Sequence, residues 1–124
     1  MTGWTQEELA AVDRAKDLYI SIPNEDGTMH KPTWIWAVRS GDDVYARGFA
    51  GTASRWYVAA KAAGHGHILV GGIEKDVTFE FPADAATNDP LDKIYPAKYA
   101  DSPYANSMSG ETQRAATVRF IPDK

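Results

Sequence analysis

Short stretches of β-forming residues, each bounded by turn residues, constrain the fold of this 124-residue chain more than any other feature. These stretches do not alternate regularly with helical segments, as the strands of a parallel sheet would. The pattern therefore predicts one α+β domain over residues 1–124, built on an antiparallel sheet that curls into a small barrel. The six predicted strands cover residues 18–22, 33–39, 44–48, 67–71, 76–81 and 116–121.

The second of these stretches has apolar residues on both faces. Along residues 33–39, alternate positions carry tryptophan or valine on one face and isoleucine or alanine on the other. Side chains of a strand point to opposite faces in turn, so this pattern indicates burial on both sides. We expect residues 33–39 to form one central strand.

Helix signals accompany the strands at three places. A helix over about residues 6–16 begins with Thr5 and Glu8, which have the spacing of a capping box, and Trp4 is placed to pack on Leu9. A second helix is expected over residues 54–63, with Ser54 as its cap and Gly64 ending it in a left-handed conformation. A third is expected over residues 89–100, because proline at position 90 suits the first turn of a helix.

Composition and charge exclude several classes of function. The chain has 17 acidic and 13 basic residues and a net charge of −4, without the basic stripe of a nucleic-acid-binding protein. It has no cysteine, which excludes thiol catalysis and cysteine-based zinc sites. No apolar run is long enough for a membrane helix, and the acidic first residues are unlike a signal peptide, so a cytoplasmic location is expected.

One junction of strand, loop and helix has the residues of an anion site. Arg47 ends a strand, Gly51 and Thr52 lie in the loop, and Ser54 and Arg55 open the next helix. Free N–H groups at a helix N-terminus bind phosphate, and hydroxyl and guanidinium groups add hydrogen bonds. In the alternative interpretation Ser54 only caps the helix, Arg47 is a solvated strand residue, and the glycine only turns the chain.

Aromatic and histidine residues give two further candidates. Trp36, or a neighbouring tryptophan, offers an indole on which a flat cofactor ring would stack; the alternative is that these tryptophans fill the core. His65 and His67 share one face of an extended segment and with His30 suggest a metal site. Nothing in the sequence brings His30 near them, and we predict no metal.

Four segments of the chain are similar to a known family: residues 33–38 (TWIWAV), 43–48 (DVYARG), 51–57 (GTASRWY) and 98–104 (KYADSPY). Over roughly residues 18–120 the chain resembles a family of small uncharacterised bacterial proteins. That family is similar to the deazaflavin-dependent nitroreductases and to the pyridoxamine-phosphate-oxidase-like FMN-binding split barrels.

The resemblance implies a split barrel, a homodimer and a cofactor, FMN or deazaflavin, bound as a small-molecule ligand. It also implies that Tyr99 or Tyr104 lines a substrate pocket or donates a proton. Arg47, Gly51, Thr52, Ser54, Arg55 and Trp36 are then the candidate cofactor-binding residues.

Two functions remain open on this sequence. The first is an oxidoreductase that uses flavin or deazaflavin to reduce a small organic substrate, with the hydride chemistry carried by the cofactor. The second is a non-enzymatic binding module or dimeric scaffold with an empty cofactor cleft. Whether the chain is an enzyme is not decided by the sequence.

Overall fold

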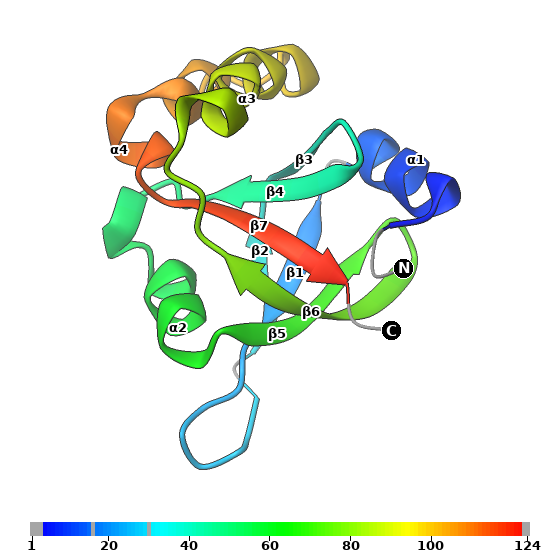
Figure 1. Ribbon diagram of the computed structural model, residues 1–124, viewed down its shortest axis with the longest axis vertical. Helices are drawn as coiled ribbons and strands as arrows, with labels where there is room; N and C mark the ends of the chain where they lie inside the picture. Colours follow the sequence, from blue (N-terminus) through cyan, green and yellow to red (C-terminus); the bar gives the residue numbers. More distant parts are fainter. Residues whose placement is uncertain (1–3, 16, 30, 123–124) are drawn as a thin grey trace.

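The computed structural model describes residues 4–15, 17–29 and 31–122. These residues form a seven-stranded antiparallel sheet with helices around it (Figure 1). The strands are β1 (Leu18–Ser21), β2 (Thr33–Ile35), β3 (Ala37–Ser40), β4 (Asp43–Arg47), β5 (His65–Val70), β6 (Ile73–Glu80) and β7 (Thr117–Pro122). The helices are α1 (Gln6–Arg14), α2 (Arg55–Ala63), α3 (Ala85–Lys98) and α4 (Glu111–Arg114), with 3₁₀ turns η1 (Gly51–Ala53) and η2 (Ala105–Ser109).

The sheet closes on itself because its two edge strands are consecutive in the chain. The strand order is β2-β1-β5-β6-β7-β4-β3, so β2 and β3 lie at opposite ends. Only Trp36 separates them in sequence. Two edges joined by one residue must lie next to each other, which bends the sheet into a nearly closed barrel with a single seam. The predicted α+β antiparallel barrel is confirmed.

The expectation of one central strand over residues 33–39 is wrong. The segment breaks at Trp36 into two edge strands, which accounts for seven strands where the sequence predicts six. Trp34 on β2 is 53% exposed. Apolar residues on both faces indicate burial on both sides, but here part of the outer face lines a cleft.

Two groups of apolar side chains hold the fold together. The larger group fills the barrel, where alternate strand residues such as Ile20, Ile68, Val118 and Phe120 point inward. The smaller group lies between α3 and the outer face of β3 and β4: Val38, Tyr45, Leu91, Tyr95, Tyr99 and Met108. In Figure 1, α3 crosses over β3 and β4 at the top, while α2 lies on the other side of the barrel.

The first two helices follow their sequence signals. Thr5 and Glu8 form the predicted capping box, although α1 ends at Arg14 rather than near residue 16. Trp4 packs in the same core as Leu9, and its indole N–H donates to the Phe120 carbonyl at 3.0 Å. Gly64 ends α2 with φ +79°, as predicted.

The predicted start of the third helix is wrong. Helix α3 begins at Ala85, because the Asp84 carboxylate accepts a hydrogen bond from the Thr87 backbone N–H and caps it there. Pro90 and Pro96 therefore lie inside the helix. An interior proline removes one backbone N–H donor, and its ring crowds the carbonyl four residues earlier, so both prolines weaken the helix. The buried residues of α3, such as Leu91 and Tyr95, pack against β3 and β4 and supply stabilisation that does not depend on those hydrogen bonds.

The hairpin of β5 and β6 gives a pH-dependent contribution to stability. His67 Nδ1 lies 2.9 Å from Asp76 and Nε2 lies 3.4 Å from Glu74. The hydrogen bond to Asp76, helped by Glu74, raises the pKa of His67 above its usual 6.5. Since the folded-state pKa is raised, the stabilisation is complete below pH 6.5 and is lost as the pH rises through the folded-state value.

We predict that the free energy of unfolding falls between pH 6 and pH 8.5 by less than about 1 kcal/mol through this group, because the side chain is partly exposed to solvent. Urea denaturation at both pH values measures it. The His67→Gln variant should lose that part of the pH dependence, and His65→Gln should keep it. An unchanged pH dependence in His67→Gln would contradict the assignment.

Candidate functional site

A cleft of about 550 Å³ opens over the seam of the barrel. Its walls come from β2 and the following Trp36, from the end of β4 and its connection to the start of α2, and from the segment around η2. Among the described residues that line it, only Arg47 carries a charge at neutral pH. The lining residues are Trp34, Ile35, Trp36, Arg47, Phe49, Ala50, Ser54, Trp56, Tyr104 and Met108.

Aromatic rings dominate this cleft and are held by one another. Trp36 stacks on Tyr99 with centroids 4.1 Å apart and planes 4° from parallel, and Trp34 meets Trp36 edge to face at 6.4 Å. Phe49 and Tyr104 make another edge-to-face pair at 5.8 Å. Flat, partly exposed rings in an apolar cleft suit a planar ligand.

The N-terminus of α2 lies at this cleft without a side-chain cap. Ser54 occupies the cap position, but its Oγ accepts from the Ala50 backbone N–H at 3.0 Å and not from the first turn of α2. The expectation that the Ser54 side chain caps the second helix is therefore wrong, and so is the alternative in which capping is its only role. The first-turn N–H groups therefore have no hydrogen bond from the cap side chain, and the helix dipole favours negative charge there.

The other loop residues have different surroundings. Gly51 has φ +66°, and a Cβ at this position would lie 2.5 Å from the Thr112 side chain, so α4 requires the glycine by packing against it. Thr52 and Arg55 are exposed and do not line the cleft. Thr52 lies in the 3₁₀ turn before α2 and Arg55 is the first residue of α2, so both are close in sequence to the N-terminus of that helix.

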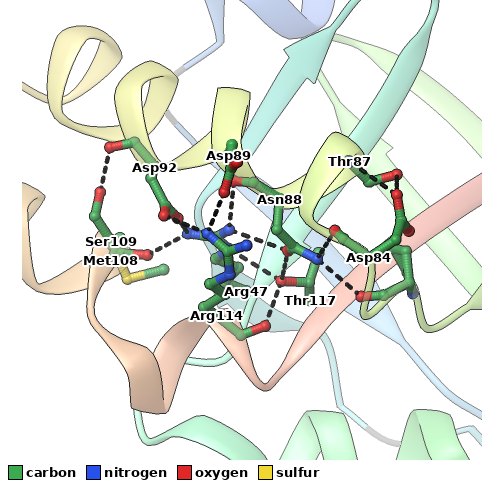
Figure 2. Close-up of polar contacts among 11 residues, drawn as sticks. Arg47, Asp84, Thr87, Asn88, Asp89, Asp92, Met108, Ser109, Arg114 and Thr117 are labelled. Atoms are coloured by element: carbon green, nitrogen blue, oxygen red, sulfur yellow. Dashed lines mark hydrogen bonds and ion pairs between the residues drawn. The ribbon is translucent and has the colours of Figure 1, made fainter.

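Arg47 is buried, being 1% exposed, and its guanidinium is fully used inside the protein (Figure 2). Nε donates to Thr117 Oγ1 at 3.0 Å. Nη1 donates to Asp92 at 2.7 Å and to the Met108 carbonyl at 2.9 Å. Nη2 donates to the carbonyl and the side-chain oxygen of Asn88 at 3.2 and 3.1 Å. The interpretation of Arg47 as a solvated strand residue is wrong.

An arginine side chain has five N–H groups, and these contacts occupy all of them. The geometry therefore weighs against a direct hydrogen bond from Arg47 to a phosphate, although that assignment stays a prediction. What Arg47 does is join β4 to α3, η2 and β7. Arg114 extends the network, contacting Asp92 at 2.7 Å and Asp89 at 2.8 Å.

This network is not among the features predicted from the sequence, although the sequence contains a signal for it. Asn88, Asp92, Tyr95 and Tyr99 recur at the spacing of one helix face, next to the apolar Leu91. Two polar residues on a buried face require partners there. Arg47 ends a strand of mainly apolar residues, and a charge that is buried there also requires hydrogen-bond partners.

The two candidate tyrosines lie in different environments. Tyr99 is buried behind Trp36, and its hydroxyl donates to the Ala37 carbonyl at 3.1 Å. Burial raises the pKa of Tyr99. Tyr104 is 58% exposed and lines the cleft. The structure thus brings Tyr104, Trp36 and Ser54 to one cavity, and keeps the Tyr99 hydroxyl out of it.

Of the histidine pair, His67 contacts two carboxylates, Asp76 and Glu74. Within the described ranges, no group of three or more His, Asp or Glu side chains is arranged to hold a metal ion. His30, the third ligand considered from the sequence, lies outside the described residues.

No helix in the described part of the chain is long and apolar enough to cross a membrane.

Comparison with known proteins places the chain among bacterial relatives. The family described as "Uncharacterized protein conserved in bacteria (DUF2255)" matches residues 8–120. None of the curated proteins matches the chain. This match confirms the resemblance to a family of small uncharacterised bacterial proteins that is predicted from the sequence.

Solved structures share the fold at low sequence identity. A conserved hypothetical protein from Mycobacterium tuberculosis has a TM-score of 0.74 and 12% identity, covering 98% of this chain and 82% of its own. A putative pyridoxamine 5'-phosphate oxidase from Listeria innocua has a TM-score of 0.67 and 11% identity, covering 95% and 92%. An F420-H2 dependent reductase has a TM-score of 0.62 and 15% identity, covering 87% and 94%.

We predict that Arg47→Met destabilises the fold by about 3–5 kcal/mol, because it removes one member of a charge pair and all five hydrogen bonds that the buried guanidinium donates. Urea denaturation followed by circular dichroism measures this. Arg114→Met, which removes an arginine from the exposed end of the network, should cost less. A loss for Arg47→Met no larger than that for Arg114→Met would contradict the buried-network interpretation.

Proposed function

The chain belongs to this bacterial family of uncharacterized proteins, and we propose that it binds a flavin-type cofactor in the cleft over the barrel seam. The observation that carries the proposal is an aromatic, nearly uncharged cleft of about 550 Å³ beside an uncapped helix N-terminus. A planar ring and an anionic tail are the two parts of a flavin nucleotide, and the site offers one surface for each.

The ring fits the cleft by size and by chemistry. Cavities of about 300–1,000 Å³ are typical of cofactor sites. Trp36 is fixed by its stack on Tyr99, so its indole keeps one orientation without a ligand. A preorganised flat surface lowers the entropy lost when a planar ring binds.

The anionic tail fits the N-terminus of α2. The N–H groups of the first turn would donate hydrogen bonds to a phosphate oxygen, with Ser54 beside them and the exposed guanidinium of Arg55 close in sequence. Arg47 would act indirectly, by holding the Met108 carbonyl and with it one wall of the cleft. FMN and a deazaflavin both satisfy this description, and solved structures of similar fold are named for pyridoxamine phosphate oxidase and F420 chemistry.

A bound flavin-type cofactor would supply hydride transfer to a small organic substrate, which makes an oxidoreductase the favoured activity. The described lining residues include no carboxylate, histidine or lysine. The chain would therefore bind and orient the cofactor and exclude water, with Tyr104 as the hydroxyl available in the cleft. The same lack of an acid or base supports the second candidate, a binding module without catalysis.

We propose in addition that the chain forms a homodimer. Tyr19 pairs with Trp34 on one side and with Leu69 on the other across β2, β1 and β5. The three side chains are 41%, 53% and 39% exposed, so they form an apolar row on the outside of the barrel. A second copy would bury this row, because apolar rows of this kind mark contact surfaces.

A cytoplasmic location remains a prediction.

We predict that FMN quenches tryptophan fluorescence on binding and that Arg55→Ala weakens FMN by about twofold to fivefold, the range for an exposed charge pair. Riboflavin, which has the same ring and no phosphate, is the matched ligand and should bind both proteins equally. Trp36→Leu should weaken both ligands. An equal loss of FMN and riboflavin affinity in Arg55→Ala would contradict the phosphate seat. The absence of FMN, riboflavin and deazaflavin binding would contradict the proposed function.

The dimer has a separate test. Leu69→Glu places a charge in the apolar row and should shift the molar mass in light scattering from dimer to monomer at micromolar concentration. Lys75→Glu changes a charge outside the row and should leave the mass unchanged. A parent protein that is already monomeric at high micromolar concentration would contradict the dimer.

A further inference from the structure

A second cavity, of about 420 Å³, lies beside α2 and away from the aromatic lining described above. Tyr57 and Lys61 of α2 form one wall, the connection from β6 to α3 forms another, and Glu111 and Arg114 of α4 form a third. Its floor includes Asn88 and Thr117, whose side-chain oxygens are already bonded to Arg47. The polar groups left to a ligand are therefore those on the walls.

The Tyr57 hydroxyl is the first of these groups. The residue is only 6% exposed, and within the described part of the chain its hydroxyl has no hydrogen-bond partner. Among the described residues, every fully buried side-chain polar atom has a hydrogen-bond partner. Since the Tyr57 hydroxyl has none, it is not fully buried. Tyr57 lines the second cavity, so we infer that its hydroxyl faces that cavity. Edge-to-face contacts with Trp56 and Phe81 fix the ring, so this hydroxyl keeps its place.

Lys61 supplies the charge at this cavity. Its Nζ lies 4.5 Å from the centre of the Phe81 ring, and Tyr57 contacts the same ring at 5.7 Å. Lys61 has no carboxylate partner among the described residues. Arg114 differs, because Asp89 and Asp92 already compensate its charge. Lys61 therefore contributes the uncompensated positive charge, and Glu111 the opposing negative charge.

We propose that this cavity binds a small organic carboxylate. Its oxygens would accept hydrogen bonds from the Tyr57 hydroxyl and from Lys61 Nζ, and its apolar body would pack on Phe81 and Pro82. A hydroxyl and an ammonium group that flank one aromatic ring match an acid with a flat or short apolar body. This site is independent of the proposed cofactor, since none of these residues lines the first cleft.

The experiment is a titration of the full chain with sodium benzoate, followed by amide chemical shifts in ¹H–¹⁵N spectra. We expect the largest shifts at residues 57–61 and 81–83, and weaker binding of benzamide, which has the same ring without the charge. Lys61→Gln and Tyr57→Phe should each raise the dissociation constant by about threefold to tenfold. Lys93→Gln makes the same charge change on a residue outside the cavity and should have no effect.

The Glu111→Gln variant tests the contribution of wall charge to carboxylate binding, and the expected change in affinity is opposite to that of Lys61→Gln. It removes a negative charge from the wall, so benzoate should bind more tightly to it than to the parent. The proposal is overturned if benzamide binds as tightly as benzoate, if benzoate shifts only residues of the aromatic cleft, or if Tyr57→Phe and Lys61→Gln bind like the parent.

Discussion

The buried guanidinium of Arg47 decides where the outer elements of this protein lie. A charge that is removed from water must be paired and hydrogen-bonded, and Arg47 finds its partners in Asn88, Asp92, Met108 and Thr117. These residues come from α3, η2 and β7, and they lie 41 to 70 positions after Arg47 in the chain. One strand side chain thereby fixes a helix, a turn and a second strand around itself. It also explains why α3 tolerates two prolines, since the helix is held by its partners as well as by its own backbone.

The same side chain stands between the two cavities. Arg47 and Met108 line the aromatic cleft, whereas Asn88 and Thr117 form the floor of the second cavity. The walls of both spaces therefore depend on one hydrogen-bonded network. The barrel supplies the rest of the cleft, because the change from β2 to β3 at Trp36 closes the sheet and brings Trp34 and Trp36 to the seam. The same break at Trp36 thus closes the sheet and forms the aromatic wall of the cleft.

The sequence predicts the features that depend on neighbours along the chain. The capping box at Thr5 and Glu8 and the left-handed Gly64 follow from local patterns and are confirmed. Each predicted strand other than residues 33–39 overlaps a single observed strand. The break at Trp36 does not follow, since alternation along 33–39 shows which residues are apolar but not which face meets the core. The start of α3 is misplaced because proline at position 90 suits a first turn, while the cap at Asp84 is a less visible signal. The surroundings of Arg47 depend on residues 41–70 positions away, which no local pattern contains.

The position of each cation relative to the interior determines what it can do for a ligand. Arg47 uses all five of its N–H groups in hydrogen bonds inside the protein, so it has no donor left to offer. Arg55 and Lys61 lie at the surface of α2, one at its first residue and the other in its last turn. Their charges are weakened by water, but they are not compensated by a buried partner. At both proposed sites, anion recognition would therefore rest on a surface cation next to a hydrogen-bond donor: Arg55 beside the first-turn amides of α2, and Lys61 beside the Tyr57 hydroxyl. The buried charge builds the site, and the exposed charges are the ones that remain for a ligand.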